Sequence, residues 1–492
     1  MKKQAINPFL PMHEYIPDGE PHVFGDRVYL FGSHDKENGD TYCVLDYTIY
    51  SASVDNLADW TNKGINYSGR QDPLATEEWK YLYAPDVVQG NDGKFYLYYC
   101  LSGYAGKGGY QGPISVAVCD TPDGKYEFYG HVQYADGTLL KRFVPFDPAV
   151  MNDDGVIRLY YGTCFFFADK ENMWNRWLFR KIESGLFSKP VEEVKMEDVM
   201  GAVTCVLEDD MITVKTGPVK IMPSKVKGTE FEGHGFFEAS SIRKIGSKYY
   251  FIYSSQNNHE LCYATSAYPD KNFRYGGVIV SNGDVGIDGR TEKDSLNMIG
   301  NNHGSIVNIN GAWYVFYHRP TNKSAYSRQA CAEPIIISED GQILQAEMTS
   351  CGLNGGPLKG SGKYPAAMCC NLFKGRMPRP INGFTKKKIP YVKGRNGKTI
   401  VSDICDGTVI GYKYFEFSGK TEVSVAVRGG AGELIIRTSL NGSEKGRIQI
   451  EENPMWTVFK TTVDFMKQEK ALYFEYKGNS PIEFLGLELK PI

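Results

Sequence analysis

The stretch NDGKFYLYY (residues 91–99) joins a turn signal to a short run of aromatic and aliphatic side chains. Aromatic residues favour strands and Asn-Asp-Gly favours a tight turn, so the stretch predicts the second half of a β-hairpin. Four other turn-strand segments share this pattern: Gly25–Phe31, Asp153–Tyr161, Gly246–Tyr253 and Asn310–Tyr317. The sequence therefore predicts one hairpin repeated five times.

The spacing of these strands indicates their arrangement. They begin at positions 28, 95, 157, 249 and 313, so successive strands are 67, 62, 92 and 64 residues apart. Blades of a β-propeller repeat every ~40–50 residues, and longer loops account for the excess. A single blade cannot bury both of its faces, whereas five blades in a ring can. We predict an all-β chain in which residues 1–350 form a five-bladed β-propeller.

An ionisable residue precedes each of the five strands at nearly the same distance. Asp18, Asp86, Asp147, Glu238 and His303 stand 10, 9, 10, 11 and 10 residues before the strands. The first strand of each blade lines the central channel, so we expect the five side chains to converge at one mouth of it. Clustered carboxylates raise the pKa of at least one of them, which leaves a protonated acid beside an ionised base. Glycoside hydrolysis needs that pairing.

The segments that carry these residues resemble glycoside hydrolase family 43. They are IPDGEPHVFGD (16–26), YAPDV (83–87), FDPAV (146–150), FFEASS (236–241) and HGSIV (303–307), in family order over residues 7 to 350. The resemblance implies an inverting mechanism, with Asp18 as general base and Glu238 as general acid. It implies that Asp147 tunes the pKa of the acid and holds the sugar. Asp86 matches a position near the pocket, and His303 matches a histidine that helps to hold a cation, often calcium, on the propeller axis.

Two assignments stay open. The family often has Asp-Pro at the base position, whereas Asp18 is followed by glycine, and Glu20-Pro21 reproduces that dipeptide two residues later. Glu20 is therefore a rival base. Arg290, in the loop before His303, is a candidate to bridge carboxylates or to bind a sugar hydroxyl, and a surface arginine is the alternative interpretation.

Composition narrows the function classes. The 492 residues carry a net charge of −3, which argues against a general nucleic-acid binder, and no apolar run is long enough for a membrane helix. At the amino terminus, Asn7, Pro8 and Pro11 interrupt any apolar signal segment. The 11 cysteines are scattered without a CxxC motif, as is typical of free thiols in a reducing compartment. We expect a cytoplasmic protein.

The remaining residues predict a second domain. Residues 351–385 are rich in Gly, Lys and Pro and are predicted to connect two domains. Alternating strand patterns over 386–492 predict a β-sandwich of the jelly-roll type. Its strand order resembles a family 6 carbohydrate-binding module, with Tyr412, Trp456 and Asn479 near the positions that such modules use. A sandwich that only supports the catalytic domain is the alternative.

The family resemblance implies an exo-acting enzyme that removes pentoses from hemicellulose oligosaccharides or polysaccharides. We expect α-L-arabinofuranosidase first, β-xylosidase second and arabinanase third, with the long third interval as a candidate wall of the pocket. No organic cofactor, nucleic-acid partner or membrane partner is expected, and the oligomeric state stays open. The alternative to an enzyme is a propeller that binds carbohydrate without catalysis.

Overall fold

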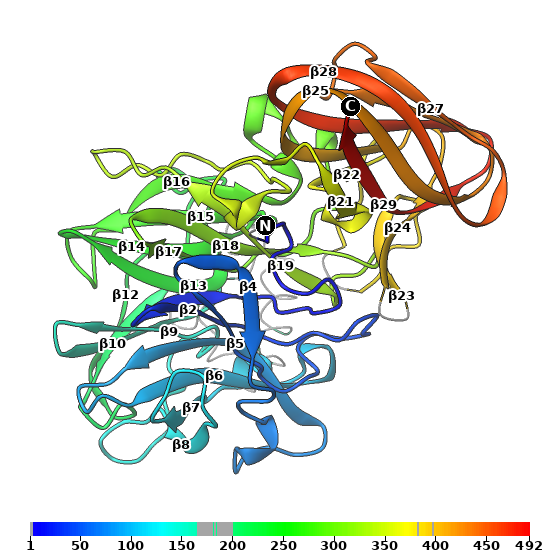
Figure 1. The fold of residues 1–492 in the computed structure, drawn as a ribbon. Helices are drawn as coiled ribbons and strands as arrows, with labels where there is room; N and C mark the ends of the chain where they lie inside the picture. The colour runs from blue at the N-terminus through cyan, green and yellow to red at the C-terminus, as the bar shows by residue number, and fades with distance from the viewer. Residues whose placement is uncertain (1–2, 165–180, 182–183, 185–199, 381–382, 396–397) are drawn as a thin grey trace.

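The computed structural model describes residues 3–164, 181, 184, 200–380, 383–395 and 398–492. Its strands form five small antiparallel sheets and one ten-stranded sheet (Figure 1). No helix within the described residues is long and apolar enough to cross a membrane. Outside residues 165–199, the helical elements of the described chain are single 3-10 turns: η1 (Gly69–Gln71), η2 (Tyr104–Gly106), η3 (Gly109–Gln111), η5 (Asn282–Asp284), η6 (Ile287–Gly289), η7 (Glu292–Asp294), η8 (Gly352–Asn354) and η9 (Ala366–Met368).

The five small sheets are the blades of a propeller, as the repeat predicted, and each is listed from its inner to its outer strand. The first two blades are β1 (Glu20–Phe24), β2 (Arg27–Phe31), β3 (Tyr50–Ser53), β4 (Asn56–Asn62), and β5 (Trp79–Gln89), β6 (Phe95–Gly103), β7 (Ile114–Cys119), β8 (Glu127–His131). The third and fourth are β9 (Ala149–Asp153), β10 (Val156–Tyr161), β11 (Val203–Leu207), β12 (Val214–Lys220), and β13 (Phe236–Ile245), β14 (Lys248–Ser255), β15 (Glu260–Ser266), β16 (Arg274–Ser281). The fifth is β17 (Ser305–Ile309), β18 (Ala312–Pro320) and β19 (Arg328–Ile335).

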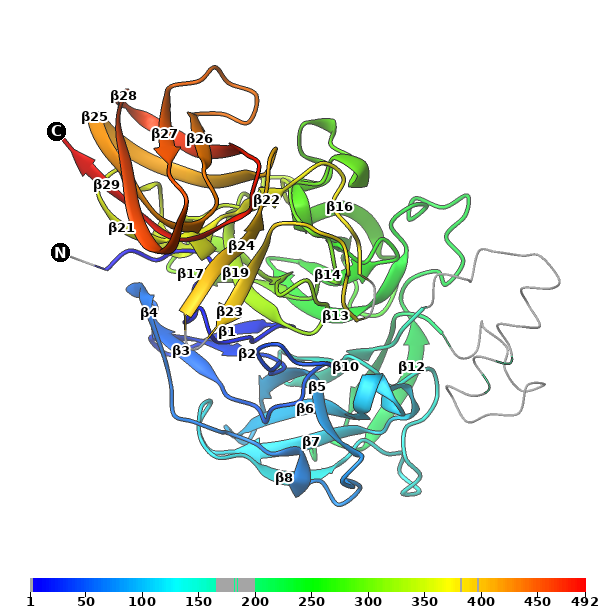
Figure 2. The same ribbon diagram turned by 90° about the vertical axis from the view of Figure 1, so that its right-hand side faces the viewer.

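The inner strands close a ring. Strands β1, β5, β9, β13 and β17 each contact the next in order, and β17 returns to contact β1. A parallel bridge between Gly19 and Gly304 joins the first blade to the fifth. Asn7, which precedes the first blade, also contacts the fifth blade. Its side chain donates to Ala332 O and accepts from Ala332 N of β19. The five inner strands therefore surround the propeller axis, and four of them (β1, β5, β13 and β17) are labelled in Figure 2.

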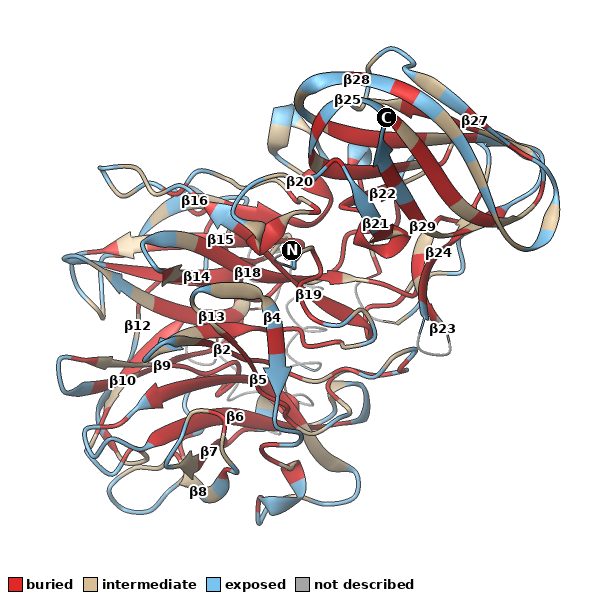
Figure 3. Ribbon diagram, in the orientation of Figure 1, coloured by how far each residue is buried: buried red, intermediate tan, exposed pale blue. Residues whose placement is uncertain are grey.

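The predicted hairpins are present in all five blades as antiparallel pairs β1–β2, β5–β6, β9–β10, β13–β14 and β17–β18. Their turns need left-handed residues, and Gly93 and Gly311 adopt φ of +85° and +86° with open space at the Cβ position. The second strand of each hairpin is buried between neighbouring blades (Figure 3). Burial of Tyr98, Tyr160 and Tyr253 shows why these strands are rich in aromatics, since wide rings fill the space between diverging blades.

The carboxy-terminal strands form a β-sandwich around their own core. The strands are β20 (Leu358–Lys359), β21 (Gly362–Pro365), β22 (Asn371–Phe373), β23 (Tyr391–Arg395), β24 (Lys398–Ile404), β25 (Val409–Gly429), β26 (Gly432–Arg437), β27 (Gly446–Ile450), β28 (Asn453–Gly478) and β29 (Ile482–Pro491). The long strands β25 and β28 pair with each other and curl around buried aromatics, among them Phe417 and Phe465, whose rings stack 4.0 Å apart. Strands β20 to β22 lie within the predicted connecting segment, yet they pair with β25 and β29. The domain boundaries stay a prediction.

Buried polar contacts hold the sandwich against the propeller. Lys413 Nζ of β25 lies 2.9 Å from Asp284 Oδ2 and 2.9 Å from Glu347 Oε2, and both Lys413 and Asp284 are buried. Arg319 of β18 donates to the carbonyl oxygens of Ala367 and Cys369. Because a buried charge is costly without its partner, these contacts stabilise one relative position of the two parts.

Candidate active site

Four of the five predicted residues meet at one end of the inner strands. Asp18, Asp147 and His303 each stand two residues before an inner strand, and Glu238 lies at the start of β13. His303 Nδ1 lies 3.8 Å from Asp18 Oδ1 and 3.9 Å from Asp147 Oδ2. The amide of Ala239, next to Glu238, donates to Asp147 Oδ2 at 2.9 Å. The propeller thus brings together carboxylates that are far apart along the chain.

The backbone is left-handed at or beside each of these three carboxylates. The φ angles are 57° at Asp18, 46° at Asp147 and 68° at Ala239. Register shifts interrupt the pairing of β13 with β14 on both sides of Glu238. Aspartate tolerates this conformation better than most residues, but alanine does not. Such backbone strain is concentrated at functional sites, where the surrounding structure holds it in place.

Asp18 is kept ionised by a buried cation. Arg328 Nη1 donates to Asp18 Oδ1 at 2.8 Å, and both side chains are buried. Burial alone would raise the pKa of Asp18, but the interactions that lower it, of which the charge of Arg328 is the largest, outweigh burial and hold that pKa below its ordinary value. The site therefore has one carboxylate suited to accept a proton.

A neutral His318 ring accepts a hydrogen bond from the backbone amide of Asp18. Its Nε2 lies 2.9 Å from the carbonyl oxygen of Asn301, so Nε2 carries the proton, and Nδ1 accepts from the amide of Asp18 at 3.2 Å. Burial lowers the pKa of His318 to about 3, which agrees with a neutral ring. The ring positions Asp18 without contributing a charge.

Arg328, the first residue of β19, is a residue of the site that the sequence patterns did not predict. Its Nε and Nη2 also donate to Asp35 at 2.8 and 3.0 Å, and its guanidinium lies 4.8 Å from the ring centre of Tyr42. The sequence proposed Arg290 as the arginine that bridges carboxylates, whereas Arg328 bridges Asp18 and Asp35. The available signal was the run RQACAEPI (328–335), which places charged residues in an otherwise strand-like segment.

Glu238 and Asp147 have raised pKa values. Burial, followed by the charge of Asp18, raises the pKa of Glu238 to about 8, while Arg328 and a hydrogen bond with Tyr110 act in the opposite direction. Burial and the charge of Glu238 raise the pKa of Asp147 well above its ordinary value. The sequence predicted that Asp147 tunes the pKa of Glu238. The two carboxyl groups interact with each other, and the charge of Asp18 adds to the rise in the pKa of both. Glu238 is partly exposed, so a protonated carboxyl can reach a ligand.

Asp86 lies deeper along the propeller axis than the other four residues. It forms a group with Glu20 and His22, and His22 Nε2 lies 2.7 Å from Asp86 Oδ1. The amides of Val87 and Val150 each donate to Asp86 at 2.8 Å, and the residue is fully buried. The register of β5 shows this deeper position, because Asp86 pairs with Tyr98, the fourth residue of β6, whereas Glu238 pairs with Ser254, the seventh residue of β14. Asp86 therefore holds inner strands together and presents no open surface to a sugar.

Glu20 belongs to this deeper layer as well. Its Oε2 accepts from Arg243 at 2.8 Å and from Ser241 at 3.1 Å, while its Oε1 is buried without a partner. Burial raises the pKa of Glu20 to about 8. A buried carboxyl that is protonated at neutral pH is poorly suited to act as a base.

Arg290 binds its own loop. Its Nη1 donates to the carbonyl oxygens of Asp284 and Ile287, each at 3.1 Å, and its Nη2 lies 3.9 Å from Asp288. These contacts close the turn that contains η6. They do not join Arg290 to the carboxylates.

The residues around His303 do not make a calcium site by themselves. Calcium takes six to eight oxygen ligands. His303 offers a ring nitrogen, and of the two nearby carboxylates, Asp18 is already bound to the Arg328 cation. Burial also lowers the pKa of His303 to about 4, so the ring is neutral at ordinary pH. Most ligands of a cation here would have to be water molecules.

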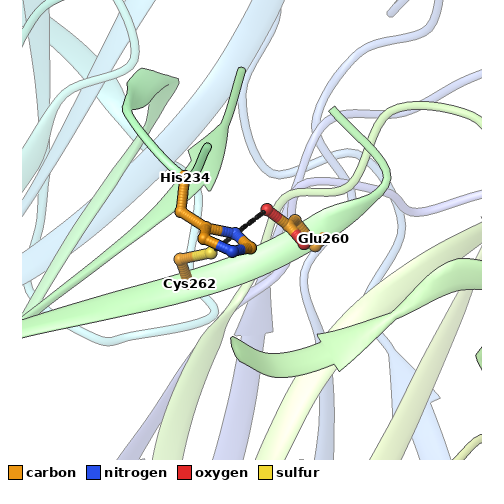
Figure 4. A group of neighbouring side chains, drawn as sticks. All are labelled: His234, Glu260 and Cys262. Atoms are coloured by element: carbon orange, nitrogen blue, oxygen red, sulfur yellow. Dashed lines mark hydrogen bonds and ion pairs between the residues drawn. The ribbon is translucent and has the colours of Figure 1, made fainter. Parts of the chain in front are cut away.

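A second group of side chains has donors that metals use. His234, Glu260 and Cys262 lie together at β15 in the fourth blade (Figure 4). Glu260 Oε1 already accepts from Ser255 at 2.5 Å and Asn257 at 2.9 Å, and His234 Nδ1 lies 2.6 Å away. Burial raises the pKa of the Cys262 thiol well above its ordinary value. Hydrogen bonds within the protein thus account for this cluster.

The predicted sugar contacts of the sandwich are only partly accessible. Tyr412 is completely buried, and its hydroxyl donates to Ala366 O at 3.0 Å, so it cannot bind a carbohydrate. Trp456 lies on β28 with the guanidinium of Arg428 4.7 Å from its ring centre. An alternating pattern could not show which face of β25 carries Tyr412.

Fold and site together define a glycoside hydrolase built on a five-bladed β-propeller, in which an ionised and a protonated carboxyl lie at the same end of the inner strands. No protein-family model matches the chain. The chain is 45% identical over 495 residues to a xylosidase/arabinosidase of Thermoclostridium stercorarium, covering 97% of both proteins. It is 28% identical to a β-xylosidase of Xylanibacter ruminicola, covering 67% of this chain and 96% of that protein.

Solved structures agree with this classification. A family 43 β-xylosidase/α-arabinofuranosidase from a compost microbial metagenome, in complex with xylotriose, has a TM-score of 0.52 and 25% identity, covering 70% of this chain and 98% of that one. The fold of a family 43 arabinoxylan arabinofuranohydrolase from Bacillus subtilis is similar along 100% of this chain and 99% of that one, with a TM-score of 0.50 and 19% identity. The chain belongs to glycoside hydrolase family 43, as its motifs indicated.

Proposed function

We propose that this enzyme is an inverting exo-glycosidase that releases terminal α-L-arabinofuranose from arabinoxylan-type oligosaccharides. The observation that carries the mechanism is the opposite shift of two neighbouring carboxyl groups. The pKa of Asp18 is held below its ordinary value, and that of Glu238 is raised to about 8. Near neutral pH one group is a base and the other an acid, which is the division of roles that hydrolysis requires.

In the proposed reaction, Glu238 gives its proton to the glycosidic oxygen as the bond from that oxygen to the anomeric carbon breaks. Asp18 takes a proton from a water molecule, whose oxygen forms the new bond to the anomeric carbon from the opposite face. The Glu238 carboxylate and the protonated Asp18 then exchange protons with solvent. Asp147, bonded to the amide next to Glu238, is proposed to hold the sugar and the acid in position.

Asp18 is preferred to Glu20 as the base. Glu20 is bound to Arg243 and Ser241 in the deeper layer, and its raised pKa keeps it protonated. Asp18 is ionised and lies beside Glu238 and Asp147, whose pKa values its charge raises. Inversion itself rests on the family resemblance.

The second candidate is β-xylosidase, with arabinanase third. The relatives carry names that combine xylosidase and arabinosidase, and one is named a β-xylosidase. An endo-arabinanase of Thermotoga petrophila matches over only 29% of this chain. Part of the candidate pocket wall in the third interval (165–180, 182–183 and 185–199) lies outside the described residues.

The test is a comparison of nitrophenyl α-L-arabinofuranoside, nitrophenyl β-xyloside and arabinoxylan fragments, with wild type and Glu238→Gln. We expect arabinofuranoside to be cleaved fastest by wild type. Proton NMR of the first product should show the anomer opposite to that of the substrate. A first product with retained configuration contradicts inversion, and a preference for xyloside replaces the first candidate with the second.

We also propose that the enzyme works in the cytoplasm on short imported oligosaccharides. All 11 cysteines are free thiols, in agreement with a reducing compartment. Pentosidase activity should appear in the cell fraction of a culture. Activity found mainly in the medium contradicts this location.

A further inference from the structure

A row of aromatic rings runs from the buried arginine of the site to the surface. The guanidinium of Arg328 lies 4.8 Å from the ring centre of Tyr42. The rings of Tyr42 and Tyr326 meet edge to face at 4.6 Å, and those of Tyr326 and Phe384 at 5.7 Å. Since Arg328 binds Asp18, the row begins one side chain from the proposed base and ends at Phe384.

Phe384 is the exposed end of this row and comes from outside the propeller. It precedes β23 of the sandwich and is 53% exposed, whereas Tyr326 is only 7% exposed. An exposed phenylalanine side chain adds little to the stability of the fold, because much of its apolar surface stays in water. Its place at the exposed end of a row of rings that begins at Arg328 therefore suggests another use.

The backbone around Phe384 is held firmly. The Ala325 amide donates to Gly383 O at 3.0 Å, and the Thr385 amide donates to Lys323 O at 2.9 Å. An isolated antiparallel bridge pairs Phe384 itself with Ser324. These bonds anchor the ring to the loop that precedes Arg328, so little entropy is lost when a ligand packs against it.

A second half-exposed ring lies near the same row. Tyr104 of η2 is 54% exposed. Its loop is anchored next to Tyr42, because the amide of Ala105 donates to Thr41 Oγ1 at 2.7 Å. Aromatic rings and a few polar groups at the edge of a pocket are typical of a small-ligand site, and the apolar face of a pyranose can stack on such rings.

We propose that Phe384, supported by Tyr326 and with Tyr104 nearby, forms a subsite for the leaving-group side of the substrate. Its ligand class is the β-linked xylosyl units that remain after the terminal pentose is removed. This inference rests on the proposed function, because it takes the terminal sugar to lie at Asp18 and Glu238. It assigns to the segment between the two domains a direct part in substrate selection.

The test compares a substrate that reaches this subsite with one that does not. For wild type, Phe384→Ala and Phe384→Trp, kcat/KM is measured on arabinosylated xylotriose and on methyl α-L-arabinofuranoside. If wild type prefers xylosides, xylotriose and methyl β-xyloside are used instead. Tyr268→Ala is the matched control, since Tyr268 is 49% exposed in the turn between β15 and β16.

We expect Phe384→Ala to lower the ratio of kcat/KM values, oligosaccharide over methyl glycoside, by about five- to tenfold, mainly through KM. Phe384→Trp should keep a ratio near that of wild type, and Tyr268→Ala should match wild type. Calorimetric titration of xylotriose into Glu238→Gln, with and without Phe384→Ala, should show a similar loss of affinity. An unchanged ratio and unchanged affinity overturn the subsite. Wild type that cleaves neither substrate overturns the proposed function, and the titration still reports on the subsite.

Discussion

Arg328 Nη1 donates to Asp18 Oδ1 at 2.8 Å, although the two residues are 310 positions apart in the sequence. This contact joins the last strand of the fifth blade to the first strand of the first blade. It also separates the roles of the carboxyl groups, because the Arg328 cation lowers the pKa of Asp18 and the resulting Asp18 anion raises that of Glu238. One ion pair thus contributes both to ring closure and to the acid-base chemistry of the site.

Replacement of the proposed acid and base should abolish turnover without abolishing binding. We expect Glu238→Gln and Asp18→Asn each to lower kcat by about 10²–10⁴-fold, the usual contribution of a positioned acid or base. Glu20→Gln is the matched control and should lower kcat less than about tenfold, because glutamine resembles the protonated Glu20. Initial rates and calorimetric binding of xylotriose check this. Wild-type rates in Asp18→Asn together with an inactive Glu20→Gln would transfer the base to Glu20.

The pH profile should follow the two pKa shifts. Activity needs protonated Glu238, so it should fall as pH rises through about 8. It also needs ionised Asp18, so the acidic limb should lie below the ordinary aspartate value of 3.8. Tyr110→Phe removes a hydrogen bond that lowers the pKa of Glu238, and should move the basic limb upward by about 0.4 to 1 pH unit. Tyr268→Phe serves as the control for kcat/KM measured across pH, and a downward shift in Tyr110→Phe would contradict the assignment.

Loss of Arg328 should impair both chemistry and folding. In Arg328→Met the acidic limb should rise by about 1–3 pH units, because Asp18 loses its cation. Arg328→Lys keeps a positive charge but not the fork of donors that bonds both Asp18 and Asp35, so its acidic limb should rise by less. Arg328→Met leaves the buried carboxylates of Asp18 and Asp35 without their cation and should cost about 3–5 kcal/mol in the free energy of unfolding. Arg290→Ala, which alters only contacts within its loop, should change kcat/KM less than about twofold. Denaturant unfolding and pH profiles measure these effects, and equal behaviour of the Arg328 and Arg290 variants would refute the role of Arg328.

Replacement of the Glu238 carboxyl should stabilise the folded protein at pH 8. The folded pKa of Glu238 lies above its unfolded value of 4.5, so its favourable contribution is complete below pH 4.5 and is lost as pH rises through about 8. Glu238→Gln should therefore raise the Tm by about 2 °C at pH 8 and change it little at pH 4. Scanning calorimetry of wild type and Glu238→Gln at both pH values measures these changes in Tm. A Tm that falls at pH 8 would mean that the Glu238 carboxylate stabilises the native state.

Chelation of calcium should have a modest effect. The protein supplies few oxygen ligands around His303, so activity after EDTA treatment and gel filtration should stay within about threefold of the untreated value. His303→Ala should lower activity more than chelation does, since the ring also contacts Asp18 and Asp147. Complete loss on chelation, with recovery on addition of calcium, would show that water-bound calcium is essential.

The sequence alone contained enough information for the fold and for most of the site. Turn signals, aromatic strands and their spacing predicted five hairpins, because local conformation and burial leave a repeating pattern in the residues. The motifs located Asp18, Asp147, Glu238 and His303, which the structure brings together. Asp86 shows the limit, since an offset of nine residues could not show that Asp86 pairs with Tyr98 and so lies at the level of Glu20, which pairs with Phe31.

Partners and protonation states were decided only by the tertiary structure. Arg328 was not recognisable as the partner of Asp18, and Arg290 was proposed instead. A sequence does not show which side chain of the fifth blade reaches the first blade when the ring closes. The same limit concealed the effect of the Asp18 charge on the pKa of Glu238 and the burial of Tyr412. Patterns along the chain record which residues are buried and where turns occur, but electrostatic shifts depend on through-space distances and dehydration, which arise only when the ring closes.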